Sequence, residues 1–285
     1  MRDAVYKHRS NFDRFGSMKS ARPPIFDTMS NLTRILTVAD LHQSARLYSQ
    51  LAQAVDRHRP DVLVLLGDFL DLSGTGTGML SVAACAHAIA RMRVPEVVVV
   101  RGNHEGWNFL EFSEVFTSTG RQFRALHGEH LTHGQMTMIG FPCVLGDETA
   151  FTLHKRPLPA HPDGWLPKLV GKIGPAARTL WLMHEPPAGT PLSVSSGPIA
   201  GNREWTDAIH RFSPRLVICG HDHLTPLKTG RWHCRIGDTV VVNVGQPHVP
   251  EVHYFLVEAL HAGLSLTATA SIRLLSMHWN QTLSL

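Results

Sequence analysis

Residues 97–105 read Val-Val-Val-Val-Arg-Gly-Asn-His-Glu, and this stretch decides the fold. Four consecutive valines are typical of a strand that is buried on both faces of a sheet. The run ends at Gly102, where the backbone can turn sharply, and Asn103, His104 and Glu105 follow directly. An amide oxygen, an imidazole and a carboxylate at the end of a buried strand suit a metal or phosphate site better than they suit a plain polar turn.

Four more apolar runs in the chain are followed by side chains that can bind a metal ion, namely aspartate and histidine. They cover residues 34–39, 62–66, 179–183 and 216–219. The side chains that follow them are Asp40 and His42, then Asp68, then His184, and finally His221 and His223. Ligands of open α/β sheets bind at the carboxyl ends of the strands, so we expect these groups to gather at one edge. One such strand end is weak evidence, but five in one chain predict a metal site.

Alternation along an extended backbone gives the expected side-chain directions. It places Asp40 and His42 on one face of their segment, and His221 and His223 on one face of theirs. Between the strands, Ser44 is expected to cap a helix that runs to His58, and further helices are expected over residues 79–93 and 202–212.

The rest of the chain is less regular. Short strands are expected at 121–126 and 136–141, and strands near 231–236, 239–244, 252–258 and 264–274 suggest a β meander that closes a second sheet. The Pro- and Gly-rich segment 142–175 is either a surface excursion or a loop that contacts substrate. The glycine-rich segment 73–78 lacks the Lys-Ser/Thr ending of a P-loop and is interpreted as a mobile loop near the mouth of the site.

The amino-acid composition limits the kinds of function that the chain can have. The chain has 285 residues, 43% of them hydrophobic, and a net charge of +4 that permits an anionic substrate without indicating nucleic-acid binding. We expect a basic, loosely ordered arm over residues 1–30 and a single domain over 31–285. Four scattered cysteines favour a reducing compartment, so a cytoplasmic location is predicted, and no apolar run approaches the roughly 20 residues of a membrane span.

The strand-end motifs together resemble a known family. In order they are Asp40-x-His42, Gly67-Asp68-x-x-Asp71, Gly102-Asn103-His104-Glu105, His184 and Gly220-His221-x-His223. This set, spread over residues 34–245, resembles the signature of the calcineurin-like metallophosphoesterases. The resemblance implies an α/β fold, a four-layer α/β/β/α sandwich of two mixed sheets flanked by helices. It is specific at the level of the superfamily.

The resemblance also implies two divalent metal ions and a role for each motif residue. One ion would be held by Asp40, His42, Asp68 and His223, and the other by Asp68, Asn103, His184 and His221. Asp68 would bridge the two, and mixed N/O ligation suits Mn, Fe, Zn or Co. Asn103 and Arg101 would contact substrate, and His104 would face it as a proton donor. We expect the Asp71 carboxylate to accept a hydrogen bond from the His104 ring and keep that ring protonated.

These assignments predict a phosphoesterase that acts on a small or exposed phosphate mono- or diester. Two ions roughly 3.5–4 Å apart can bind phosphate oxygens and generate an attacking hydroxide between them. Leu72 and the sequence Glu185-Pro186-Pro187 depart from the Ser/Thr protein phosphatases, which carry a phosphate-gripping arginine and His-Gly-Gly there. The alternatives are a nuclease of the same superfamily, disfavoured because no long basic stripe appears, and a non-catalytic interaction module that retains the fold. The oligomeric state stays open.

Overall fold

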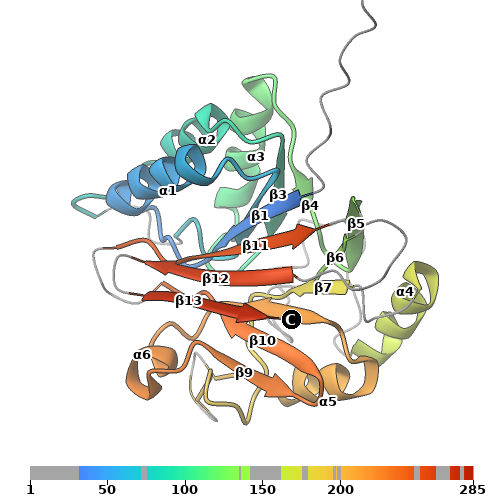
Figure 1. Cartoon of the computed structure of the whole chain (residues 1–285). Helices are drawn as coiled ribbons and strands as arrows, with labels where there is room; N and C mark the ends of the chain where they lie inside the picture. The colour runs from blue at the N-terminus through green and yellow to red at the C-terminus, as the bar shows by residue number, and fades with distance from the viewer. Residues whose placement is uncertain are drawn as a thin grey trace, which may run out of the picture. The chain divides into compact units, whose positions relative to one another are not determined.

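Buried apolar strands build two mixed β-sheets (Figure 1). The computed structural model describes residues 32–71, 76–134, 136–141, 162–174, 179–194, 197, 200–246, 251–260, 270–276 and 279–284. Residues 31–285 form one compact unit. The basic arm predicted for residues 1–30 lies outside the described residues, as do most of the segment 142–175 and positions 73–75 of the glycine-rich loop.

The first sheet contains the valine run of residues 97–100. Its order is β13-β12-β11-β1-β2-β3-β4, counting the strands that the structure describes. Four strands run parallel, namely β1 (Leu32–Val38), β2 (Val62–Leu66), β3 (Glu96–Val100) and β4 (Arg124–Ala125). Three run antiparallel to their neighbours, namely β11 (Tyr254–Leu260), β12 (Ala270–Ser276) and β13 (Trp279–Ser284). β2 and residues 97–100 of β3 are apolar throughout because both of their faces are covered.

The second sheet has the order β5-β6-β7-β8-β10-β9 within the described part of the chain. Its parallel centre consists of β6 (Met136–Gly140), β7 (Thr179–Leu182), β8 (Leu216–Cys219) and β10 (Thr239–Asn243). The antiparallel strands β5 (Glu129–His133) and β9 (His233–Ile236) form its edges.

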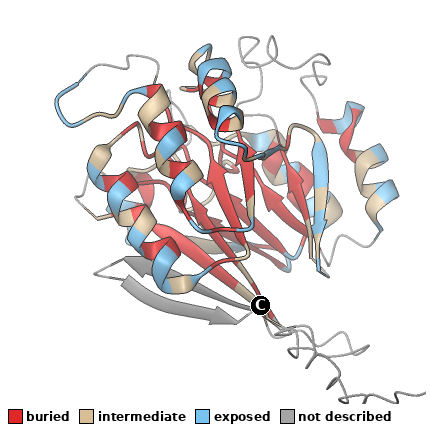
Figure 2. Ribbon diagram, turned by 90° about the horizontal axis from the view of Figure 1, so that it is seen from above, coloured by how far each residue is buried: buried red, intermediate tan, exposed pale blue. Residues whose placement is uncertain are grey.

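Alternation along the strands separates three apolar layers. On β2, Leu63 and Leu65 pack with residues of the covering helices, whereas Val64 and Leu66 pack with residues of the second sheet. The outer face of the second sheet packs against α5, where Trp205 is fully buried. Figure 2 shows the buried strands between helices whose outer faces are exposed. The order helix, sheet, sheet, helix confirms the predicted four-layer α/β sandwich.

Six α-helices are described, and α1, α2 and α3 lie together beside the first sheet (Figure 1). They are α1 (Ala45–His58), α2 (Val82–Arg91), α3 (Asn108–Ser118), α4 (Leu166–Ile173), α5 (Arg203–Phe212) and α6 (Thr225–Thr229), with a 3-10 turn η2 at Pro162–Gly164. Ser44 caps α1 by accepting the N–H of Leu47, as the sequence predicts. Among the described residues, no helix is both long and apolar enough to span a membrane.

The structure corrects two expectations about the fold. The predicted C-terminal meander is divided between the sheets: β9 and β10 join the second sheet, but β11 pairs antiparallel with β1 in the first. Helix α3 lies in a region that the sequence analysis left irregular, although Phe109, Phe112 and Phe116 occupy one face at helical spacing and are buried.

Candidate metal centre

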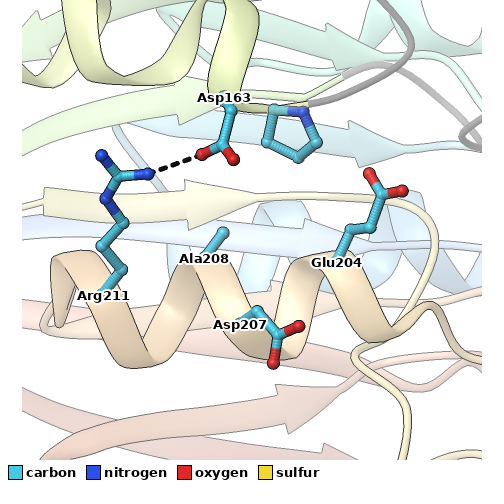
Figure 3. Close-up of a pocket in the computed structure, with 6 residues that line it drawn as sticks. Asp163, Glu204, Asp207, Ala208 and Arg211 are labelled. Atoms are coloured by element: carbon cyan, nitrogen blue, oxygen red, sulfur yellow. Dashed lines mark hydrogen bonds and ion pairs between the residues drawn. The ribbon is translucent and has the colours of Figure 1, made fainter.

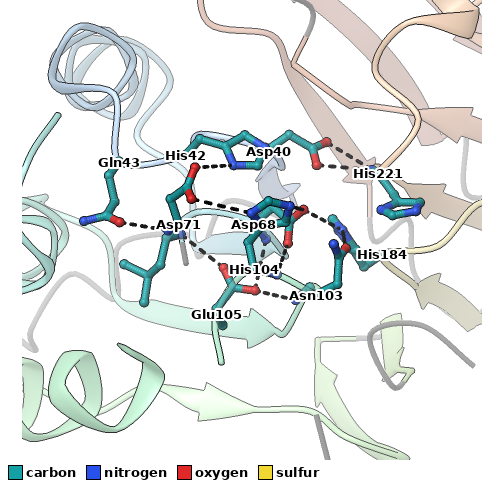
Figure 4. A network of polar contacts seen from close by, with 12 residues as sticks. Asp40, His42, Gln43, Asp68, Asp71, Asn103, His104, Glu105, His184 and His221 are labelled. Carbon is teal, nitrogen blue, oxygen red and sulfur yellow. Dashed lines mark hydrogen bonds and ion pairs between the residues drawn. The ribbon is translucent and has the colours of Figure 1, made fainter. Parts of the chain in front are cut away.

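The expected ligands meet at the carboxyl ends of strands from both sheets (Figure 4). The residues that follow β1, β2 and β3 reach the centre from one sheet, and those that follow β7 and β8 reach it from the other. The structure therefore brings together the side chains that the sequence predicts at this edge: Asp40, His42, Asp68, Asn103, His104, His184 and His221.

The backbone of these turns is held in an unfavourable conformation. Asp40, His42, Asp68 and His221 have φ values of 55°, 43°, 50° and 65°. A left-handed conformation costs a residue other than glycine on the order of 1 kcal/mol, although Asp and His tolerate it better than most. Strain of this kind persists only where surrounding contacts fix it, and it concentrates at functional sites.

Two glycines let the turns approach each other. A Cβ on Gly67 would collide with the imidazole of His184, and a Cβ on Gly102 would collide with the carboxylate of Asp68. These positions therefore exclude side chains for lack of space, and the glycines allow Asp68 and His184 to come close.

One group of ligand atoms is formed by Asp68, His184 and His221. Their nearest N and O atoms lie within 4.8 Å of one another, and all three residues are buried. His184 Nε2 lies 3.2 Å from Asp68 Oδ2 and 3.1 Å from Asn103 Oδ1. Its other ring nitrogen, Nδ1, lies 3.0 Å from the carbonyl oxygen of Leu66 and fixes the orientation of the ring.

A second group is formed by Asp40, His42 and Asp68, whose ligand atoms also lie within 4.8 Å of one another. Both oxygens of Asp40 accept the backbone N–H of His221, at 3.3 and 3.1 Å, which ties the β1 turn to the β8 turn. His223 lies beside this group, with its ring centroid 6.2 Å from that of His42. Asp68 belongs to both groups and is placed between them.

The electrostatics of the centre demand positive charge. Burial raises the pKa of Asp40 to about 8, although His184 lowers it. Burial also raises the pKa of Asp68, but the adjacent His184 outweighs that effect and holds it below its usual range. Burial lowers the pKa of His184, but the adjacent Asp68 carboxylate outweighs that effect and raises it to about 10.

This charge pattern fits a divalent cation. A cation can compensate both buried carboxylates and bind the imidazole nitrogen after displacing its proton. Carboxylate oxygens together with imidazole nitrogens are donors that suit Mn, Fe, Zn or Co. The residues present thus match the metals that the sequence predicts.

The expected hydrogen bond between Asp71 and His104 is not formed in this structure. His104 Nδ1 lies 3.7 Å from Asp71 Oδ1, which is longer than a hydrogen bond. Asp71 is closer to His42, whose Nδ1 lies 3.3 Å from Oδ2. The His42 and His104 rings meet edge to face, with centroids 4.8 Å apart, and the Asp71 carboxylate lies beside both. His104 itself lies at the surface of the centre, with 34% of its side chain exposed.

Glu105 has a role that the sequence did not reveal. Its carboxylate is fully buried and accepts three backbone N–H groups, from Asp68 at 3.1 Å, Leu70 at 3.1 Å and Gly102 at 2.5 Å. It therefore links the turn after β2 to the turn after β3 through buried hydrogen bonds. Burial raises the pKa of Glu105 to about 7.

Arg101 is placed by packing. It is buried, its guanidinium lies 5.1 Å from the centre of the Phe109 ring, and it donates to the carbonyl of Gly106 at 3.5 Å. A contact between Arg101 and substrate stays a prediction.

Two more residues that sequence reasoning missed hold the β8 turn. Asp222, between His221 and His223, accepts the N–H groups of Leu224, Thr225 and Val194. Asn243 donates to the carbonyl oxygens of Leu192 and Asp222. A buried Asp and Asn after apolar strands are the available signal, but their partners are distant in sequence.

Another hollow lies between η2 and α5, lined by Pro162, Asp163, Glu204, Asp207, Ala208 and Arg211 (Figure 3). Asp163 and Arg211 pair with each other at 2.6 Å on the surface. This hollow therefore lacks the buried histidine and carboxylate groups of the centre.

The sequence profile of the calcineurin-like phosphoesterases matches residues 33–224, and the chain belongs to this family. No protein with a curated description matches it. Solved structures share the fold. A dimetal phosphatase from Danio rerio is 13% identical, with a TM-score of 0.56 over 88% of this chain and 98% of that one. TT1561 of Thermus thermophilus is 15% identical, with a TM-score of 0.55 over 78% of this chain and 93% of that one.

Proposed function

We propose that this protein is a dinuclear metal-dependent phosphoesterase that hydrolyses a small or exposed phosphate mono- or diester. The observation that carries the proposal is the sharing of Asp68 by two groups of ligand atoms, one with Asp40 and His42 and the other with His184 and His221. A carboxylate has two oxygens and a negative charge, so it is suited to lie between two cations.

This arrangement supports the two ligand sets that the resemblance implies. Asp40, His42 and Asp68, completed by His223, would hold one ion, and Asp68, Asn103, His184 and His221 would hold the other. When bound, the two ions supply Lewis acidity for the phosphate oxygens and an activated water. The Danio rerio protein that shares the fold is a dimetal phosphatase, which supports the same assignment at the level of the fold.

The chain's own residues orient the ester and move a proton. His104 is partly exposed, and its Nε2 lies 3.9 Å from Asp68 Oδ2, so it sits at the boundary between the buried ligands and solvent. From there it can donate a proton to the leaving oxygen. The Asp71 carboxylate lies within 4 Å of both His104 and His42, so it flanks the ring of the proposed proton donor. A cytoplasmic location stays a prediction.

The test is a measurement of metal content followed by a substrate screen. The protein is stripped with a chelator, reloaded with Mn²⁺, and assayed on p-nitrophenyl phosphate, bis-p-nitrophenyl phosphate and cyclic nucleotides. The proposal expects about two bound equivalents and hydrolysis that is lost with the chelator and restored by the metal. Less than about one tightly bound equivalent, with no hydrolysis of any ester, would overturn it and favour a non-catalytic interaction module.

A further inference from the structure

Trp107 is exposed where neither folding nor capping calls for a tryptophan. Its relative exposure is 74%, the largest among the exposed large hydrophobic residues in the described part of the chain. It occupies the N-cap position of α3 and makes no side-chain capping hydrogen bond. Short polar residues are strongly preferred at that position. The N-cap position of α3 therefore gains nothing from this indole, which is free to contact a ligand.

Two of the exposed large hydrophobic residues, Trp107 and Leu110, are neighbours. Trp107 and Leu110 follow the turn that carries His104, and Leu227 follows the turn that carries His223. Trp107 and Leu110 are three residues apart, and Leu110 N–H donates to the carbonyl of Trp107, so they are neighbours in the first turn of α3. Trp107 and Leu110 thus form a small apolar surface on the first turn of the helix that follows the His104 turn.

Contacts along the chain keep Trp107 beside His104. Three peptide units separate them, so their Cα atoms are at most about 11 Å apart, and an indole can cover most of that distance. The flanking residue Asn108 donates its side-chain amide to the carbonyl of Asp71 at 2.7 Å, and the N–H of Phe109 donates to the carbonyl of Glu105 at 3.1 Å. The backbone of residues 107–109 is therefore held beside the turns that carry Asp71 and Glu105, and the first turn of α3 with Trp107 follows on the side of the expected proton donor.

We infer that Trp107, with Leu110 beside it, stacks on a planar aromatic group in the alcohol part of the ester, so that the substrate class is a nucleoside phosphate. The inference rests on the proposed function, because the proton donor His104 marks the side on which the alcohol departs. The metal ligands recognise only the phosphoryl group, which every phosphate ester shares. An exposed indole one short loop away can recognise a base through its π-face, independently of base sequence.

The test compares the binding of two ligands that differ only in the base. The probes are the non-hydrolysable phosphonate analogues of adenosine monophosphate and of ribose 5-phosphate, titrated into the Mn²⁺-loaded full chain by calorimetry. Stacking on an aromatic side chain predicts that the adenosine analogue binds about 5- to 150-fold tighter. Trp107→Ala should remove most of this preference and leave the affinity for the ribose analogue unchanged. Trp107→Phe should keep part of it.

Glu114→Ala is the matched control, because Glu114 is also exposed on α3 but lies two turns further along. It should keep the full preference. Equal affinities of the wild type for the two analogues, or a preference that survives Trp107→Ala, would overturn the inference. Failure of the proposed function is separate: it would appear as no hydrolysis of p-nitrophenyl phosphate, bis-p-nitrophenyl phosphate or cyclic nucleotides by the Mn²⁺-loaded protein, whatever the result of the calorimetry.

Discussion

Replacing Glu105 by glutamine tests how the strained turns of the metal centre are held. The carboxylate accepts Leu70 N–H through Oε1 and both Asp68 N–H and Gly102 N–H through Oε2. Glutamine has the same shape but only one acceptor oxygen, so at least one buried N–H must face an NH₂ group. An unsatisfied buried donor costs about 1–3 kcal/mol. For a domain of this size that corresponds to a fall of about 2–12 °C in the unfolding midpoint.

The variant should also bind metal less tightly. Asp68 has a left-handed backbone conformation, with φ 50°, and its N–H donates a hydrogen bond to the Glu105 carboxylate. Loss of a group that orients a ligand typically weakens metal affinity or activity by about 10–100-fold. The assays are thermal unfolding of the chelated protein by circular dichroism and competition for Mn²⁺ with a chelating dye. Glu111→Gln, an exposed glutamate on α3, is the control. If Glu105→Gln matches that control in both assays, the positioning role is refuted.

Three further perturbations probe the site and its surroundings. Asp68→Asn should lose activity and at least one metal equivalent, because a neutral amide bridges two cations poorly. The control Asp163→Asn, in the hollow between η2 and α5, should lose neither. Elemental analysis measures the metal content of both variants, and the ester assay measures their activity. His104→Ala should keep both metals, but its hydrolysis rate on alkyl phosphate esters should fall about 10²–10⁴-fold. Its rate on p-nitrophenyl phosphate should fall much less, because the phenolate leaving group needs little protonation. Equal losses of rate on the two esters would remove the acid role from His104. Burial raises the pKa of the Cys234 thiol to about 11, so its thiolate is scarce at neutral pH. The alkylation rate of Cys234, followed by peptide mass spectrometry, should therefore rise about tenfold per pH unit from 7 to 10. A plateau of this rate near pH 9 would contradict the raised pKa.

The sequence predicts the central strands and the edge at which the ligands gather. Runs such as residues 62–66 and 97–100 are apolar because both faces are buried, and this burial is visible in composition alone. The helix caps at Ser44 and Asn202 are equally local signals. The ligands could be expected together because parallel strands present their carboxyl ends at one edge.

The side-chain directions within the turns could not be derived in the same way. The alternation argument for Asp40 and His42 assumes an extended backbone, but both residues have positive φ. They still meet, because the turn itself folds them together around Asp68. For the same reason the sequence did not show that Asp71 lies closer to His42 than to His104, or that Glu105 points inward.

Long-range strand pairing was also beyond the local pattern. The segment at 254–260 reads like any buried apolar strand, and nothing in it specifies β1, more than 200 residues earlier, as its partner. Placing it beside β9 and β10 was the shorter connection and was wrong. Helix α3, by contrast, carried a readable signal in the spacing of its phenylalanines.

The most direct test of the dinuclear site is anomalous diffraction from crystals of the Mn²⁺-loaded protein, recorded on both sides of the manganese absorption edge. We predict two peaks flanking the Asp68 carboxylate, one against Asp40 and His42 and the other against His184 and His221. A single peak there would contradict the shared-ligand assignment. So would density confined to the neighbouring group of His42, Asp71 and His104, whose ligand atoms also lie within 4.8 Å of one another.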